Sequence, residues 1–275
     1  PAGSRCAARS DRADGEPEVS APRFVAVTGA SRGIGRAIAT RLIEDGRRVL
    51  LVARDRGRLE ALAVTADGRA EVLVADLIED PAALGRAIRE SDAIDGVVHA
   101  AGIAPHAPLE LVTEEALTRA MRLHVLSPIE SVQALSRSLR GRGVPGSVVL
   151  IASTLGVRPA AGMLAYSASK AAMISAARTM ALELAADHVR VNVLAPGVVD
   201  TDMARELRSP DGSPPPEDPA QRDAAVKAQL EDLRRLHPLG RLGTPEDVAA
   251  LARHVLDAPW MTGSVVAIDG GLLAG

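Results

Sequence analysis

The sequence predicts an α/β fold in which a doubly wound parallel β-sheet carries helices on both faces. Short apolar runs of strand length recur along the chain and alternate with helical patterns, the order that builds a parallel sheet. The strands of such a sheet are buried on both faces, so continuously apolar runs suit them. The length of 275 residues suits one α/β unit with a full core, which we expect over residues 23–275.

The first apolar run, residues 24–28, leads into a glycine-rich turn. The turn reads G-A-S-R-G-I-G over residues 29–35, and a helical pattern follows over residues 36–43. Glycines let the backbone approach a pyrophosphate, and a helix N-terminus offers free N–H groups and a partial positive charge. The segment therefore predicts a dinucleotide site in a Rossmann-like fold, with the spacing G-x-x-x-G-x-G instead of the commoner G-x-G-x-x-G.

The later strands are expected at residues 49–53, 71–75, 96–99, 148–151, 189–194 and 264–268. Ser153 follows the run at 148–151, so its hydroxyl is expected at or just past the carboxyl end of a strand, where it can hydrogen-bond a substrate carbonyl. The alternative is a serine that only starts a loop.

Tyr166 is the only tyrosine of the chain, and it lies four positions before Lys170, one of two lysines against thirty arginines. Positions i and i+4 share one face of a helix. A cation within about 4–6 Å favours the phenolate and lowers the phenol pKa from ~10 toward the range of a general acid or base. The alternative is a half-buried tyrosine beside a lysine that extends to solvent. Together with Ser153 upstream, the pair favours a catalytic function.

These motifs resemble the short-chain dehydrogenase/reductases, and most of all the bacterial 3-oxoacyl-[acyl-carrier-protein] reductases, over roughly residues 23–271. The resemblance implies a catalytic set of Ser153, Tyr166 and Lys170. Tyr166 would donate a proton to the developing alkoxide, and Ser153 would hydrogen-bond the same oxygen. Lys170 would lower the pKa of Tyr166 and hold the cofactor ribose.

The resemblance also implies which residues bind the cofactor. Asp76 would meet the adenine, and the segment 190–197 with Thr201 would hold the nicotinamide amide. The full implied set is Gly29, Ser31, Arg32, Gly33, Ile34, Gly35, Arg54, Asp76, Leu77, Ala101, Gly102, Tyr166, Lys170, Pro196, Gly197, Val199 and Thr201.

The expected cofactor is NADP(H). Ala53 stands where NAD-dependent members of the resembling family usually carry an acid that binds the ribose hydroxyls. Without that carboxylate nothing repels a 2′-phosphate, which Arg54 and Arg32 can hold through charge-assisted hydrogen bonds. The alternative is that both arginines belong to the solvated surface.

Two histidines depart from the family pattern. His99 stands where many relatives have asparagine, and His124 replaces the asparagine of the family's catalytic tetrad. We expect His99 to be buried, neutral and satisfied by backbone partners. His124 has three open roles: a titrating member of a proton relay to Lys170, a replacement for a relay water, or a buried structural residue.

The predicted reaction is hydride transfer from NADPH to a ketone, with a 3-oxoacyl thioester or a polyketide-like carbonyl as substrate. Arg178, Arg140 and Arg142 are candidates for contact with an acidic acyl carrier. One alternative is an alcohol, sugar or steroid-like dehydrogenase, and another is a low-turnover NADP-binding scaffold or regulator. The resemblance implies a homodimer or homotetramer that pairs through the helices bearing His124 and Tyr166.

The composition limits the other classes of function. A net charge of −3, with one residue each of Phe, Trp and Tyr, gives neither a basic surface nor a stacking platform for nucleic acid. No apolar stretch approaches the ~18–20 residues of a membrane span. Cys6 is the only cysteine, so no disulfide forms within the chain, which fits a reducing cytoplasm. We predict no metal site.

Two segments stand apart from the predicted domain. Residues 1–22 are rich in charged residues, alanine and proline, with almost nothing to bury, so a disordered leader is expected there. Residues 209–219 form a proline-rich insertion within the region 202–237, where the resembling family has a substrate-covering loop. The insertion either decorates the mouth of the pocket or is an inert surface loop.

Overall fold

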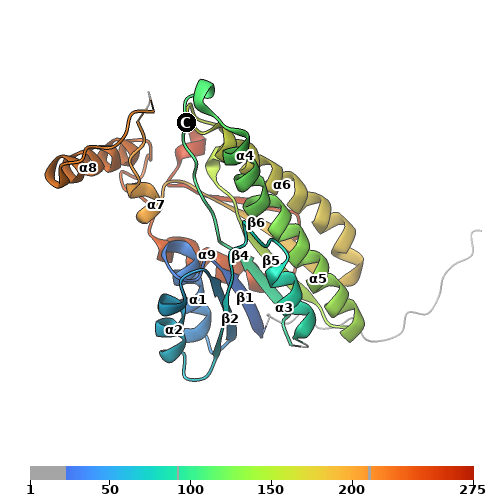
Figure 1. Cartoon of the computed structure of the whole chain (residues 1–275). Helices are drawn as coiled ribbons and strands as arrows, with labels where there is room; N and C mark the ends of the chain where they lie inside the picture. Colours follow the sequence, from blue (N-terminus) through green and yellow to red (C-terminus); the bar gives the residue numbers. More distant parts are fainter. Residues whose placement is uncertain (1–22, 92, 210–211) are drawn as a thin grey trace, which may run out of the picture.

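Seven parallel strands form one sheet in the order β3-β2-β1-β4-β5-β6-β7 (Figure 1). The computed structural model describes residues 23–91, 93–209 and 212–275, so the predicted leader at 1–22 lies outside the described residues. The strands are β1 (Phe24–Thr28), β2 (Arg48–Ala53), β3 (Ala70–Val74), β4 (Gly96–His99), β5 (Gly146–Ile151), β6 (Val189–Pro196) and β7 (Val265–Ile268). The predicted fold class is confirmed.

Helices cover both faces of the sheet (Figure 1). One face carries α1 (Gly33–Glu44), α2 (Arg56–Val64) and α9 (Pro245–Asp257), and the other carries α3 (Ala83–Glu90), α4 (Glu114–Met121), α5 (Ser127–Arg142) and α6 (Leu164–Leu184). Alternate residues of β1 enter the two apolar cores: Phe24 and Ala26 pack toward α3, α5 and α6, while Val25 and Val27 pack toward α1, α2 and α9. This double burial explains why the strand runs are apolar throughout.

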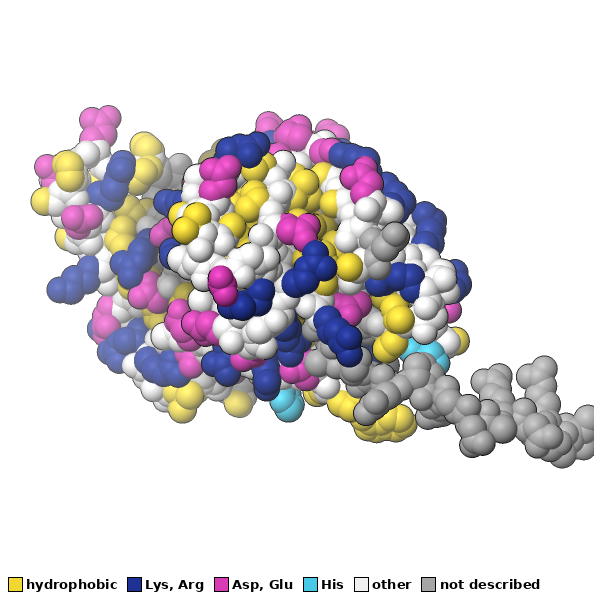
Figure 2. Space-filling view, turned by 90° about the horizontal axis from the view of Figure 1, so that it is seen from below, with side chains coloured by type: hydrophobic (Ala, Val, Ile, Leu, Met, Phe, Trp, Pro, Cys, Tyr) yellow, Lys and Arg dark blue, Asp and Glu magenta, His cyan; other side chains and the backbone are white. Residues whose placement is uncertain are grey.

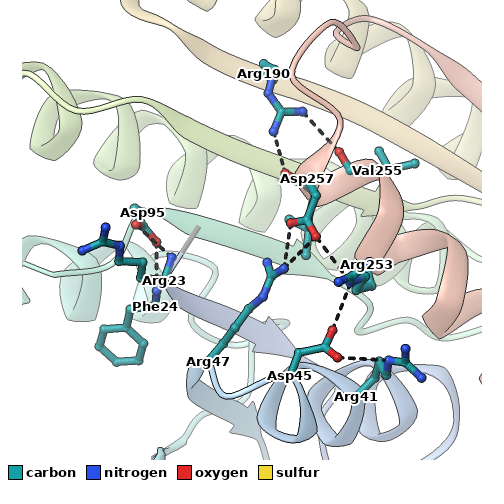
Figure 3. Close-up of polar contacts among 11 residues, drawn as sticks. Arg23, Phe24, Arg41, Asp45, Arg47, Asp95, Arg190, Arg253, Val255 and Asp257 are labelled. Atoms are coloured by element: carbon teal, nitrogen blue, oxygen red, sulfur yellow. Dashed lines mark hydrogen bonds and ion pairs between the residues drawn. The ribbon is translucent and has the colours of Figure 1, made fainter. Parts of the chain in front are cut away.

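Hydrogen bonds from side chains stabilise the contact between β1 and β4 at both ends. At its start, the carboxylate of Asp95 accepts hydrogen bonds from the backbone N–H groups of Arg23 and Phe24, each at 3.0 Å (Figure 3). At its end, Thr28 Oγ1 lies 3.2 Å from His99 Nδ1. Because strands β1 to β3 and β4 to β7 form the two halves of the sheet, this pairing joins the glycine turn to the half that includes β5, the strand that Ser153 follows.

A network of charged side chains ties the end of α9 to the sheet (Figure 3). Asp257 accepts from Arg47 at 2.7 Å, and Arg253 donates to Asp45 at 3.0 Å. The buried Arg190 donates to the carbonyl oxygen of Val255 at 3.2 Å. Arg190 thereby satisfies a carbonyl at the end of α9, where a helix leaves its last acceptors unpaired, and Arg47 adds a positive charge there.

The surface outside this network mixes charges of both signs. Figure 2 shows basic and acidic side chains interspersed over the face seen from below. Within the part of the chain that the structure describes, no helix combines the length and apolar character needed to cross a membrane.

Helix α8 (Pro219–Arg235) stands away from the sheet, and none of its residues is buried (Figure 1). It begins at the last residue of the insertion at 209–219, with Asp218 as the N-cap that accepts from Gln221 N–H at 2.8 Å. A Cβ atom at Gly212 would lie 2.8 Å from Leu111 Cδ1, so Gly212 lies against the short turn η1 (Leu109–Leu111).

Candidate active site

The turn after β1 forms a cradle that only glycine allows. Gly29 has a φ of +70°, and a Cβ atom there would lie 2.9 Å from the backbone nitrogen of Ala101. A Cβ atom at Gly35 would collide with the carbonyl oxygen of Gly29. The backbone is therefore bare at the point where α1 begins, as a bound pyrophosphate requires. The residues present fit the dinucleotide that the sequence predicts.

A cavity of about 450 Å³ opens over this cradle. Its walls include twelve predicted cofactor residues: Gly29, Ser31, Arg32, Gly33, Ile34, Gly35, Arg54, Asp76, Leu77, Ala101, Gly102 and Thr201. Tyr166, Lys170, Pro196, Gly197 and Val199 do not line it. Gly102 connects the two sets, because a Cβ atom there would lie 3.8 Å from Lys170 Nζ. Lys170 therefore lies just beyond the cavity wall.

Three arginines line the cavity. Arg32 pairs with Asp202 and Arg54 pairs with Asp76, each at 3.5 Å, and Arg58 lines the same wall. The side chains of Arg32 and Arg54 are 55% and 60% exposed, so water screens both pairs and neither holds its arginine firmly. Their charges remain available to an anionic ligand.

Ser153 and Tyr166 meet at the carboxyl end of β5. Ser153 lies two residues past the strand and accepts from Leu155 N–H at 3.1 Å, which makes it the N-cap of the turn η3 (Thr154–Gly156). Tyr166 lies in the first turn of α6 and is buried. Burial raises the pKa of Tyr166 above 10.0, whereas a hydrogen bond with Ser153 and the charge of Arg208 lower it.

Lys170 lies one turn after Tyr166 on α6 and is also buried, so it does not extend to solvent. Its Nζ donates to the carbonyl oxygen of Ile151 at 2.8 Å and lies 5.7 Å from the centre of the Tyr166 ring. Burial lowers the pKa of Lys170 to about 7. The expectation that Lys170 lowers the pKa of Tyr166 is therefore corrected: the groups that do so are Ser153 and Arg208, and burial outweighs them.

His99 and His124 are both fully buried beside this site. The ring of His99 lies between Thr28 Oγ1 at 3.2 Å and Ser127 Oγ at 3.4 Å, so its partners are hydroxyls and not the backbone groups we expected. Burial, with a smaller effect of Lys170, lowers the pKa of His99 to about 3.

His124 lies in a π-helical turn (Arg122–Leu126) between α4 and α5. Its Nε2 accepts from Ile103 N–H at 3.2 Å, and its Nδ1 lies 2.8 Å from Ser169 Oγ. Burial, followed by the charges of Lys170 and His99, lowers the pKa of His124 well below 6.5. These surroundings disfavour the open role in which His124 titrates near neutrality.

Sequence patterns missed Arg208, which lies within the region flagged as the substrate loop. Arg208 is half-buried, its backbone N–H donates to Gln229 Oε1 at 3.0 Å, and its guanidinium donates to the carbonyl oxygen of Met203 at 3.3 Å. Met203 lines the cofactor cavity, so the guanidinium stands at its rim. No carboxylate among the described residues forms an ion pair with Arg208. Its place follows from tertiary folding, and no local motif signals it.

A parallel sheet with a glycine cradle after its first strand defines a dinucleotide-binding α/β protein. The family model of short chain dehydrogenases matches residues 23–212. The chain belongs to the short chain dehydrogenase family, and the predicted class of enzyme, an oxidoreductase, is confirmed. Within the described residues, no cluster of His, Cys, Asp and Glu could hold a metal ion.

Individual relatives extend over almost the whole chain. A rhamnolipids biosynthesis 3-oxoacyl-[acyl-carrier-protein] reductase of Pseudomonas aeruginosa is 36% identical over 265 residues, 91% of this chain and 96% of that protein. The crystal structure of a 3-oxoacyl (acyl-carrier-protein) reductase of Agrobacterium tumefaciens with NADP bound has a TM-score of 0.78 and 30% identity, and covers 90% of this chain and 93% of its own.

A third relative acts on a sugar. L-sorbose reductase of Gluconobacter frateurii, solved with NADPH and L-sorbose, has a TM-score of 0.81 and 27% identity, and covers 93% of this chain and 98% of its own. The chain is therefore similar both to acyl reductases and to a sugar reductase.

Proposed function

We propose that this enzyme reduces a ketone with NADPH, and that its substrate is a 3-oxoacyl thioester or a polyketide-like carbonyl. One observation carries the proposal: the Ser153 hydroxyl lies beside the buried Tyr166 at the carboxyl end of β5 and opposes the rise in pKa that burial causes, with Lys170 one helical turn away and adjoining the cofactor cavity. A hydroxyl pair of this kind can hold and protonate a single carbonyl oxygen.

The cofactor is NADP(H). Ala53 ends β2 without a carboxylate, and Arg32, Arg54 and Arg58 stand at the same wall of the cavity. Guanidinium groups bind phosphate through paired, charge-assisted hydrogen bonds, so these residues suit a 2′-phosphate. The acyl and sugar reductases with bound NADP and NADPH support this choice.

The chain's own residues orient the substrate and move the proton, while the bound nicotinamide supplies the hydride. Tyr166 donates its proton to the oxygen that becomes the alcohol, and Ser153 donates a hydrogen bond to the same oxygen. Arg208 favours the phenolate that Tyr166 becomes after it donates its proton, because the charge of Arg208 lowers the pKa of Tyr166. Lys170 would hold the ribose of the cofactor.

The 36% identity to a 3-oxoacyl reductase supports the thioester substrate. An acyl carrier would meet the exposed Arg178, since Arg140 already pairs with Asp187 and Arg142 donates to the carbonyl oxygen of Ile94. The likeness to L-sorbose reductase favours a sugar ketone as the second candidate. A homodimer or homotetramer paired through α6 and the helical segment that carries His124, and a cytoplasmic location, complete the proposal.

The test is NADPH consumption by the purified full chain over three panels: 3-oxoacyl thioesters, cyclic ketones and sugars. We expect the highest kcat/KM for a thioester, and loss of turnover in the matched control Tyr166→Phe. A sugar preferred over every thioester would select the second candidate. Tight NADPH binding without consumption of any panel would contradict the proposal and favour a cofactor-binding scaffold.

A further inference from the structure

The buried imidazole of His124 connects two parts of the site. On one side, Nε2 accepts from the N–H of Ile103, in the loop whose residues Ala101 and Gly102 line the cofactor cavity. On the other side, Nδ1 faces Ser169 Oγ at 2.8 Å, and the Ser169 hydroxyl donates to the carbonyl oxygen of Tyr166 at 2.8 Å. A chain of three hydrogen bonds therefore runs from the cofactor loop to the backbone of the proton donor.

The hydrogen bonds fix the position of the imidazole proton. A hydroxyl has one proton, and Ser169 uses it toward the carbonyl of Tyr166. Ser169 can thus only accept from His124, so Nδ1 carries the proton, while Nε2 keeps the lone pair that the Ile103 N–H requires. A second proton on the ring would remove that acceptor and leave a buried N–H without a partner.

We propose that His124 is a positioning residue that holds the cofactor loop at a fixed distance from Tyr166 as a neutral imidazole, and that it carries no proton in the reaction. The inference rests on the proposed function. His124 is buried within the π-helical turn, a feature that is frequent at functional sites. The ring meets the Tyr166 ring edge-on, with centroids 5.8 Å apart and planes at 84°, so a displaced His124 displaces the proton donor.

The groups that face His124 oppose a second proton on it. Burial is the strongest influence that favours the neutral ring, followed by Lys170 and then His99, the ionisable groups beside it. Tyr166 is the third ionisable group in contact, and burial keeps it neutral as well.

A second buried histidine, His237, bridges two segments of the chain in the same way. His237 is buried, its Nδ1 lies 2.8 Å from the carbonyl oxygen of Leu233, and its Nε2 accepts from the N–H of Val198 at 3.1 Å. A carbonyl oxygen only accepts, so here too the proton is on Nδ1. His237 thereby joins the end of α8 to the segment that follows β6.

His99 carries its proton on the opposite nitrogen. Thr28 Oγ1 accepts from the N–H groups of Ala100 and Ala101 at 3.1 and 3.0 Å, so its own proton is donated to His99 Nδ1. The proton of His99 is then on Nε2, toward Ser127 Oγ. One protein thus contains both tautomers, and His99 is an internal reference for His124.

Heteronuclear NMR of the imidazole nitrogens tests the inference without any substrate. We expect His124 and His237 to be protonated on Nδ1 and His99 on Nε2, with no titration of His124 between about pH 6 and pH 8. Each imidazole signal is assigned by its loss in a variant that lacks the corresponding histidine. A titrating His124, or a proton on its Nε2, would overturn the proposal whether or not the enzyme reduces ketones.

Enzyme variants supply the second test, with NADPH binding and turnover measured separately. His124→Asn keeps one donor and one acceptor, so we expect kcat within about 10-fold of wild type, whereas His124→Leu keeps neither and should lose about 10²-fold in kcat and bind NADPH more weakly. Ser169→Ala should give a smaller loss of the same kind.

The pH profile of kcat should keep its shape in every active variant. An inflection of kcat near pH ~6–7 that is present in wild type and absent in His124→Asn would establish a relay and refute a positioning role. If His124→Leu fails to fold, the His124→Asn variant and the NMR experiment test the proposal.

Discussion

The ammonium of Lys170 donates a hydrogen bond to the backbone carbonyl of Ile151, at 2.8 Å, and so fastens the catalytic helix to the end of β5. In this position the lysine is buried, and burial favours its neutral form. The cation that lowers the pKa of Tyr166 is Arg208, which comes from the region 202–237 instead of from α6. The pKa of Tyr166 is therefore coupled to the conformation of that region.

Lys170 should make stability depend on pH in a defined direction. Burial lowers its pKa from 10.5 to about 7, so between these values the unfolded chain holds a proton that the folded chain has released. The free energy of unfolding therefore rises with pH across this window, by up to about 2–3 kcal/mol from pH ~7 to pH ~9. Lys170→Met should lack this increment. Urea unfolding of wild type and Lys170→Met at the two pH values measures the increase in the free energy of unfolding. An equal increase in both proteins would contradict the burial argument.

Tyr166→Phe removes the proton donor and keeps the ring that packs against His124. Turnover should fall by about 10²–10⁴, as is usual for the loss of a general acid. The dissociation constant for NADPH should stay close to that of wild type, because Tyr166 does not line the cofactor cavity. Steady-state rates and a fluorescence titration with NADPH measure the two effects. Near-normal turnover would remove Tyr166 from the mechanism.

Ala53→Asp should reverse the preference between the cofactors. The new carboxylate would stand at the wall that holds Arg54 and Arg58, and its repulsion of a 2′-phosphate can amount to several kcal/mol. The ratio of kcat/KM for NADPH to that for NADH should fall by at least about 10²-fold. Ala53→Asn, similar in size but uncharged, is the matched control and should change the ratio much less. Equal effects of both variants would mean that size and not charge is responsible.

Arg208→Met should shift the pH dependence of alcohol oxidation upward. In that direction Tyr166 must first lose its proton, and the charge of Arg208 lowers the pKa of Tyr166. Removing the charge raises this pKa further, so the rise of kcat with pH should move to higher pH. Arg205→Met is the control, because Arg205 already pairs with Asp200 at 2.7 Å. An identical pH profile for the two variants would exclude an electrostatic role of Arg208.

The sequence was sufficient for the elements whose signal is local. The predicted limits of β1 and β4 match the structure, since each is an apolar run with a turn at both ends. Strand β6 continues to Pro196, two residues past its predicted end, because Ala195 and Pro196 still pair with β7. The glycine cradle and the pairing of Tyr166 with Lys170 on one helix were likewise predictable from spacing alone.

Tertiary packing decides the properties that the sequence could not predict. The pKa of Tyr166 moves opposite to the expectation because the depth of its burial depends on the elements around α6. Arg208 and Ser169 carry no motif, and their roles follow from neighbours that are distant in sequence. The hydroxyl partners of His99 come from β1 and α5, which no local pattern connects to β4.

The seam between β1 and β4 also determines whether the chain can bind a dinucleotide. Strands β1 to β3 are neighbours in both sequence and space, as are β4 to β7, and the seam is where the two halves of the sheet join. Gly29 meets Ala101 only across this seam. A chain whose halves have formed but not joined would hold Ser153 near Tyr166 yet lack the cradle for a dinucleotide, so the competence to bind cofactor depends on the pairing of the two halves.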